Sequence, residues 1–129
     1  MFEVNVDGAS AGNPGPSGAG IVIKQNGRLE HHSLPLGEMD NHLAEFTACM
    51  KALELCIGLG AQTVWVRSDS QALVQAVEKE FVKGAAYKSV LHEILILSQQ
   101  IPLFFIKWIP SKENKMADDL ARKAIHQNE

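Results

Sequence analysis

Alternating apolar and polar residues predict the strands of this chain. Phe2 to Asp7 alternates strictly, with the two-residue period of a strand. Two more predicted strands, Ala19 to Gln25 and Arg28 to Leu36, flank Asn26-Gly27, the dipeptide most typical of a tight hairpin turn. The Gly- and Pro-rich stretch between the first two strands is predicted to form a fixed, compact loop.

A second pattern, in which apolar residues recur at three- and four-residue steps, predicts four helices. One follows a cap at Asp40 or Asn41, one begins near Ser70, one follows a break at Gly84, and the last has Ser111 as its cap. They are predicted to end near residues 59, 80, 100 and 126. Two strands separate them, and the second is the most apolar run of the chain, which predicts the best buried strand. These strands are Gln62 to Ser68 and Leu103 to Ile109.

The predicted order of elements is β-β-β-α-β-α-α-β-α. A hairpin-linked trio of strands followed by strand–helix alternation predicts an α/β fold, a mixed sheet with helices on its faces. At 129 residues, positions 1–129 are expected to form a single domain. Two helices have a predicted buried side. In the first helix it consists of Leu43, Phe46, Met50, Leu53 and Ile57, and in the last of Met116, Ala117, Leu120, Ala121 and Ala124.

Composition and charge narrow the classes of function. A hydrophobic fraction of 46% with mixed charge is typical of a soluble globular protein. No apolar run approaches a membrane span, and no segment has the pattern of a secretion signal, so we expect a cytoplasmic protein, and a monomer. The net charge of −3 argues against tight, non-specific binding to nucleic-acid phosphates. It does not argue against a site where acids hold metal ions that meet the phosphate.

Four acids lie where a site could form. Asp7 ends the first strand, and Asp69 lies between a strand and a helix, at the strand end where α/β sheets bind ligands. Glu45 lies at the margin of the apolar stripe of its helix. Asp118 lies on the last helix, one turn before Arg122. Each has an ordinary alternative: a turn residue, a helix cap, a solvated glutamate, or a surface ion pair.

If these carboxylates converge, they need divalent cations, because like charges close together raise each other's pKa. Oxygen ligands favour Mg²⁺ or Mn²⁺ over Zn²⁺. Two such ions about 4 Å apart suit in-line cleavage of a phosphodiester, one activating water and the other stabilising the leaving 3′ oxygen. Distance along the sequence does not show convergence, and that step depends on a resemblance.

Four motifs in a fixed order make the chain resemble a type 1 ribonuclease H, almost from end to end. They are Asp7-Gly8-Ala9-Ser10-x-Gly12-Asn13-Pro14-Gly15, Asn41-x-x-Ala44-Glu45, Ser68-Asp69-Ser70-Gln71 and Asn114-x-x-Ala117-Asp118-x-Leu120-Ala121. The resemblance implies a five-stranded mixed sheet, three antiparallel strands and then two parallel ones, with helices on both faces. It also implies a two-metal site that cleaves the RNA strand of an RNA–DNA hybrid, leaving 5′-phosphate and 3′-hydroxyl ends. The implied metal ligands and catalytic residues are Asp7, Glu45, Asp69 and Asp118.

By the same resemblance, polar residues near the acids contact the minor groove of the hybrid. There the 2′-hydroxyl distinguishes RNA from DNA, and amide side chains can both donate to it and accept from it. The implied substrate-binding residues are Ser10, Gly12, Asn13, Asn41, Gln71 and Asn114.

Two departures from many relatives leave an alternative open. The loop from Lys107 to Glu113 has no histidine, and the segment from Gly84 to Glu93 is too short and too neutral to form a basic protrusion. Both predict weaker binding or slower turnover. The alternative is a weakly active or inactive module of the same fold that binds hybrid or double-stranded nucleic acid. A third reading is a nuclease of this fold that acts on DNA junctions or RNA duplexes.

Overall fold

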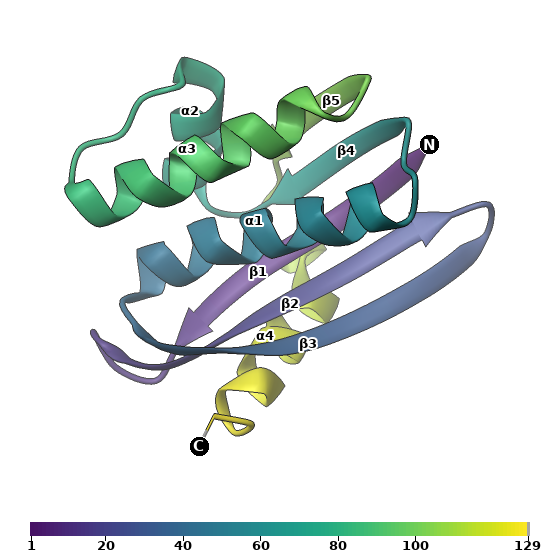
Figure 1. Ribbon diagram of the computed structural model, residues 1–129. Coiled ribbons are helices and arrows are strands. Elements are labelled where there is room, and N and C mark those ends of the chain that lie inside the picture. Colours follow the sequence, from purple (N-terminus) through teal and green to yellow (C-terminus); the bar gives the residue numbers. More distant parts are fainter. Residues whose placement is uncertain (129) are drawn as a thin grey trace.

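The computed structural model describes residues 1–128, which form one five-stranded mixed sheet with helices on both faces. The strands follow one another across the sheet in the order β3-β2-β1-β4-β5 (Figure 1). β1 to β3 are antiparallel, whereas β4 is parallel to β1 and β5 is parallel to β4, as expected. Their bounds are β1 (Phe2–Ser10), β2 (Gly15–Gln25), β3 (Arg28–Met39), β4 (Thr63–Ser68) and β5 (Leu103–Trp108).

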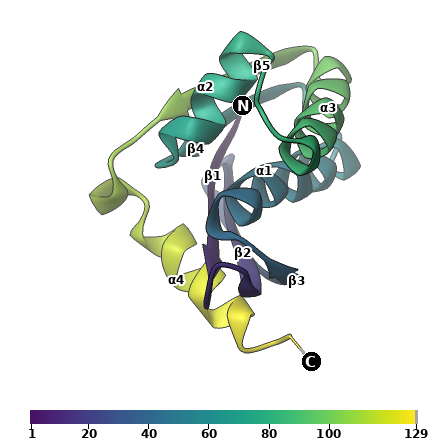
Figure 2. The same cartoon turned by 90° about the vertical axis from the view of Figure 1, so that its left-hand side faces the viewer.

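The helices divide between the two faces of this sheet, which confirms the predicted fold class. α1 and α3 lie on one face and α4 on the other (Figure 2). Buried residues of α2 share the apolar core with those of α1 and α3. The helices are α1 (Asn41–Gly58), α2 (Gln71–Lys79), α3 (Ala85–Gln99) and α4 (Lys115–Ile125), and a 3₁₀ turn, η1 (Ser111–Glu113), precedes α4.

The predicted cap at Asp40 is confirmed, the helix that begins near Ser70 is capped by Ser70 itself, and the predicted cap at Ser111 is wrong. The Asp40 carboxylate accepts from the Leu43 amide at 2.8 Å, and the Ser70 hydroxyl accepts from the Leu73 amide at 3.1 Å. Ser111 does not cap the last helix. It begins η1 instead, and α4 starts four residues later without a side-chain cap.

The predicted loop after Asp7 is mostly strand. β1 continues to Ser10 and β2 already begins at Gly15, so only a short turn at 11–14 joins them. Ser10 pairs with Ser17 in the antiparallel register, and the Ala11 amide donates to the Pro16 carbonyl at 2.8 Å. Small residues with no bulky side chain allow pairing to continue to the turn.

Small residues also determine which sides of the helices are buried. Phe46 and Leu53 are buried as predicted, but Leu43, Met50 and Ile57 are only half-buried. Small side chains let α1 lie close to the sheet, so the face of α1 that contacts the sheet is the one that carries these small residues. The buried small residues of α1 are Ala44, Ala48, Cys49, Ala52 and Cys56, and α4 likewise buries Ala117, Ala121 and Ala124 while Met116 is exposed.

The prediction for the most apolar strand is wrong. β5 is an edge strand, and Leu103, Phe105 and Trp108 on it are 55%, 47% and 41% exposed. α4 packs on β1, β2 and β3, so it does not cover this part of the sheet. Apolar content along the sequence could not distinguish an edge strand with one open face from a central strand.

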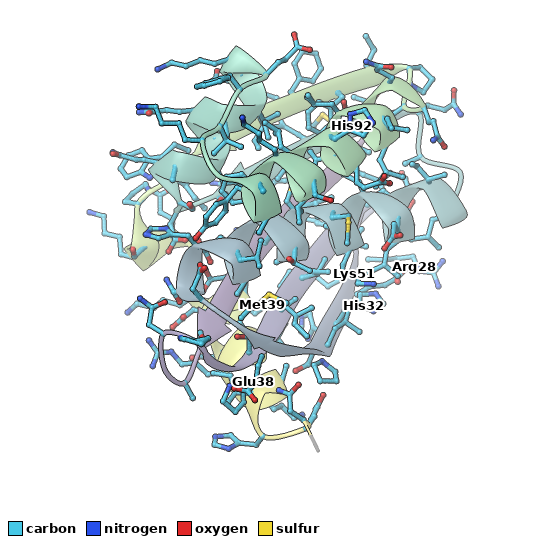
Figure 3. The ribbon with its side chains drawn as sticks, turned by 60° about the vertical axis from the view of Figure 1, so that its left-hand side comes forward. Arg28, His32, Glu38, Met39, Lys51 and His92 are labelled. Atoms are coloured by element: carbon cyan, nitrogen blue, oxygen red, sulfur yellow. The ribbon has the colours of Figure 1, made fainter. Side chains whose placement is uncertain are left out.

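Elsewhere on the surface, charged residues of both signs are exposed beside a few large apolar side chains such as Leu29 and Phe81. Arg28, Glu38 and His92 lie on the outside of the molecule (Figure 3). Both cysteines, Cys49 and Cys56, are free thiols buried in the core. Among residues 1–128, the helices are all too short or too polar to span a bilayer.

Candidate active site

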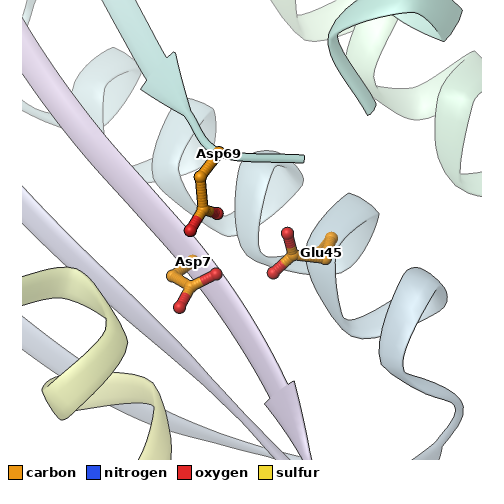
Figure 4. A group of neighbouring side chains, drawn as sticks. All are labelled: Asp7, Glu45 and Asp69. Carbon is orange, nitrogen blue, oxygen red and sulfur yellow. The ribbon is translucent and has the colours of Figure 1, made fainter. Parts of the chain in front are cut away.

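The four predicted acids line one cleft of about 700 Å³. Asp7 comes from β1, Glu45 from α1, Asp69 from the end of β4, and Asp118 from α4. Carboxylate oxygens of Asp7, Glu45 and Asp69 lie within 4.8 Å of one another, and the three side chains face each other in Figure 4. The convergence that the sequence could not show is therefore present in the fold.

Asp7 and Glu45 form the buried floor of the cleft, with exposures of 6% and 7%. The Gly8 amide donates to the Glu45 carboxylate, so the strand that carries Asp7 also fixes Glu45. A Cβ on Gly8 would overlap the backbone of Ala44, the residue before Glu45. The absence of a side chain at Gly8 therefore lets α1 approach β1 closely enough for the two acids to meet.

Asp69 is positioned by the residues on either side of it and by β5. The hydroxyl of Ser68 accepts from the Ser70 amide at 3.0 Å, and Ser70 caps α2. The indole N–H of Trp108 donates to the Asp69 carbonyl at 3.1 Å. The backbone of Asp69 is thus held between β4, α2 and the end of β5, while its side chain is only partly buried in the cleft.

Asp118 reaches the cleft because α4 lies very close to the sheet. A Cβ on Gly20 of β2 would overlap the carbonyl of Ala117, so glycine is required for this approach. Asp118 pairs with Arg122 at 3.0 Å, as its spacing predicted, and the Arg122 side chain is 71% exposed. An exposed pair of this kind contributes only about 0.3–0.5 kcal/mol, so it can open readily. The neighbouring Asp119 is exposed.

Burial raises the pKa of both residues that form the floor of the cleft, Asp7 and Glu45. Burial is the largest cause that raises the pKa of Asp7 above its ordinary value, and the hydrogen bond and charge of Glu45 add to it. Asp118 and Asp69 raise the pKa of Asp7 further. Burial also raises the pKa of Glu45. Without a cation, the pair therefore retains a proton at neutral pH.

Five of the six predicted substrate-binding residues divide into two groups. Ser10, Asn41 and Gln71 line the cleft beside the acids. Gly12 and Asn13 lie in the exposed turn between β1 and β2, outside the cleft lining, and the Asn13 side chain accepts from the Asn41 amide at 3.4 Å.

Asn114 occupies a place that does not fit the substrate contact predicted for it. It is 1% exposed, and its amide nitrogen donates to the Val6 carbonyl at 2.8 Å. Its amide oxygen accepts from the Asn5 side chain at 3.0 Å. Asn114 therefore joins the start of α4 to β1, with both ends of its amide engaged by the protein. The motif spacing pointed to the right segment but could not distinguish a groove contact from an internal one.

Comparisons with known proteins agree with this geometry. The family model described as reverse transcriptase-like matches residues 5–124. A proposed hydrolase, EbsB of Enterococcus faecalis, is 41% identical over 97% of this chain and 94% of its own length. The protein named ribonuclease H of Pelobacter propionicus is 30% identical over 95% of this chain and 83% of its own.

This chain belongs to the ribonuclease H family. Among solved structures, the LC11 ribonuclease H1 from compost, bound to an RNA/DNA hybrid, superposes with a TM-score of 0.90 at 30% identity, covering 98% of each chain. The resemblance to the ribonuclease H family that the four motifs indicated is therefore confirmed.

Sequence reasoning missed several residues in the cleft of this ribonuclease H family member, including one on β5 and one on α1. Trp108 and His42 both line it. Trp108 pairs with Ser68 across the β4–β5 register, which places it beside Asp69, and only the register reveals this. His42 follows Asn41 on the exposed first turn of α1, and its place beside a motif residue was the available signal.

The cleft residues fit divalent cations of the kind that the resemblance implied. The donors are carboxylate oxygens, a set suited to Mg²⁺ or Mn²⁺. Asp7 and Glu45 are buried close together, an arrangement that is costly unless a proton or a cation neutralises it. Asp69 and Asp118 remain partly open to solvent at the same cleft, so a hydrated ion has access to them.

Proposed function

We propose that this protein is a metal-dependent endonuclease that hydrolyses the RNA strand of RNA–DNA hybrids. One observation carries the proposal: four carboxylates from four separate elements line a single cleft, with two of them buried. Family membership and the hybrid-bound LC11 relative support the choice of substrate. The proposed products carry 5′-phosphate and 3′-hydroxyl ends.

In this proposal Asp7, Glu45, Asp69 and Asp118 hold two Mg²⁺ ions, or Mn²⁺ in their place. Bound there, the ions would supply an activated water and stabilise the leaving 3′ oxygen. The protein's own part is to hold the carboxylates in place. Asp7 and Glu45 would release the proton that they retain without a cation, and Gly8 keeps Glu45 in place by its amide. Ser10, Asn41 and Gln71 line the same cleft and are proposed to contact the hybrid, while Gly12 and Asn13 lie further out on the turn.

The test is an assay with a labelled RNA–DNA hybrid in Mg²⁺ and in Mn²⁺, on the wild type and on Asp69→Asn. Asp69 is partly exposed, so the substitution changes the cleft with little effect on folding. We expect the wild type to cut the RNA strand and the variant to lose at least about 100-fold in rate, as is typical when a preorganised catalytic group is removed. Asp119→Asn, an exposed neighbour of Asp118 with the same charge change, is the matched control and should cleave normally.

A second candidate is a binding module with little or no cleavage. The net charge of −3 and the absence of histidine from residues 107–113 favour it. Retention of hybrid without cleavage in either metal would establish this candidate, and cleavage of DNA junctions or RNA duplexes alone would move the substrate to another class. The expectation of a cytoplasmic monomer belongs to this proposal too, and light scattering tests the oligomeric state.

A further inference from the structure

The first turn of α1 is held by one side chain of α3. The Tyr87 hydroxyl lies 2.8 Å from both carboxylate oxygens of Asp40 and donates its single proton to this carboxylate. The Tyr87 ring also packs edge-on against Phe46, with the ring centroids 5.6 Å apart. Asp40 precedes α1 and Phe46 follows Glu45, so Tyr87 contacts the chain on both sides of Glu45.

The hydrogen bond from Tyr87 to Asp40 is stronger than one between two neutral groups. The Asp40 carboxylate already caps α1 through the Leu43 amide, and this bond lowers its pKa, so the group remains ionised. Burial and the Asp40 charge raise the pKa of Tyr87, which keeps the hydroxyl protonated as a donor. A hydrogen bond to an ionised acceptor is roughly twice as strong as one between neutral groups.

Other contacts hold both ends of this turn, because the Met39 carbonyl accepts from the Ser10 and Ser17 hydroxyls and the Ala44 backbone lies directly against Gly8, whereas the middle of the turn is exposed. Asn41 and His42 are exposed, and the bond from the Asn41 amide to Asn13 is long, at 3.4 Å. Gly8 fixes the Glu45 carboxylate by its amide and lies against the Ala44 backbone, but it does not contact the exposed Asn41 and His42. A groove lined by Asn13, Asp40, His42 and Tyr87 runs beside the turn, so solvent reaches it from that side as well.

We propose that Tyr87 is a positioning residue, which through Asp40 and Phe46 sets where α1 presents Glu45 and Asn41 to the cleft. This inference rests on the proposed function, because it assigns Tyr87 a part in the reaction of that site. A displacement of about 1 Å in a catalytic group can cost on the order of 100-fold in rate. Losing the Tyr87 hydroxyl therefore affects turnover more than stability.

The test is Tyr87→Phe, which keeps the ring against Phe46 and removes only the hydroxyl. We expect kcat on an RNA–DNA hybrid to fall about tenfold, the Mg²⁺ concentration for half-maximal rate to rise, and KM to change less than threefold. The control is Ser98→Ala, which removes another α3 hydroxyl whose bond, to the Leu95 carbonyl at 2.9 Å, stays within its own helix. The control should keep wild-type kcat, with a Tm within about 3 °C of Tyr87→Phe.

A double-mutant cycle with Asp40→Ser identifies the partner. Serine still caps α1 but cannot accept a charge-assisted bond from Tyr87. Asp40→Ser and the double variant Asp40→Ser/Tyr87→Phe should have the same kcat. Additive losses would overturn the assignment of Asp40 as the group through which Tyr87 acts.

Amide hydrogen exchange separates this inference from the proposed function. In Tyr87→Phe, the Leu43 and Ala44 amides, both bonded to Asp40, should exchange at least about fivefold faster than in the wild type. Faster exchange in a protein that shows no cleavage would support the positioning role and overturn the proposed function instead. Unchanged exchange, or a kcat equal to that of Ser98→Ala, would overturn the positioning role.

Discussion

Replacing Asp7 by Asn is expected to stabilise the protein when no divalent cation is present. Asp7 and Glu45 are both nearly fully buried, and burial raises the pKa of each. In the folded state the pair keeps a proton at neutral pH, whereas in the unfolded chain both groups are ionised. Folding therefore takes up a proton, and the free energy of unfolding falls as pH rises above the ordinary pKa of Asp7.

The size of this effect follows from the pH interval. The ordinary pKa of Asp7 is 3.8, so about three pH units separate it from neutrality. Each pH unit over which the folded state holds one extra proton costs about 1.4 kcal/mol, or about 4 kcal/mol at pH 7. Asn still buries a polar group, so Asp7→Asn should gain about 2–4 kcal/mol, which corresponds to about 8–15 °C in Tm for a chain of this length.

Urea unfolding in EDTA at pH 5, 6 and 7 measures the effect. The wild type should lose stability across this range, and Asp7→Asn should lose less. Saturating Mg²⁺ should reduce the difference in unfolding free energy between the wild type and Asp7→Asn. A ligand at 100 times its Kd stabilises the folded state by about 2.7 kcal/mol, and the variant should gain less because it has lost one carboxylate. Asp119→Asn makes the same charge change on an exposed residue and should match the wild type. A variant no more stable than the wild type in EDTA, with the same pH slope, would refute the reasoning.

Two further predictions concern packing. Gly20→Ala places a Cβ against the Ala117 carbonyl and should lower the free energy of unfolding by about 2–3 kcal/mol, measured by urea unfolding, with a loss of hybrid cleavage as Asp118 moves. Gly58→Ala, where a Cβ meets nothing within 4 Å, should be neutral or stabilising, and an equal loss in both variants would contradict the close approach of α4. Burial raises the pKa of Cys49 and of Cys56 to about 12, so neither thiol should react with a thiol reagent at pH 8 until the protein unfolds. Rapid labelling of the native protein would show that the core around α1 opens.

Local features of the sequence determined the elements and their order. The two-residue period of β1, the Asn26-Gly27 turn and the cap at Asp40 each depend on residues a few positions apart, and the structure confirms them. The four motifs also identified the family and named the four acids that line the cleft. In contrast, local apolarity overestimated the burial of β5, because position within a sheet depends on residues far away in sequence.

Only the tertiary structure decided which residues meet. Glu45 reaches Asp7 because Gly8 has no side chain to keep the α1 backbone at Ala44 away from β1. Asp118 reaches the cleft because Gly20 lets α4 lie close to the sheet. Packing between elements brings Tyr87 to Asp40 and Trp108 to Asp69. Packing of α4 on β1 likewise buries Asn114. The physical reason is that backbone approach and burial arise from pairs of residues separated by tens of positions, whereas a sequence pattern records only neighbours along the chain.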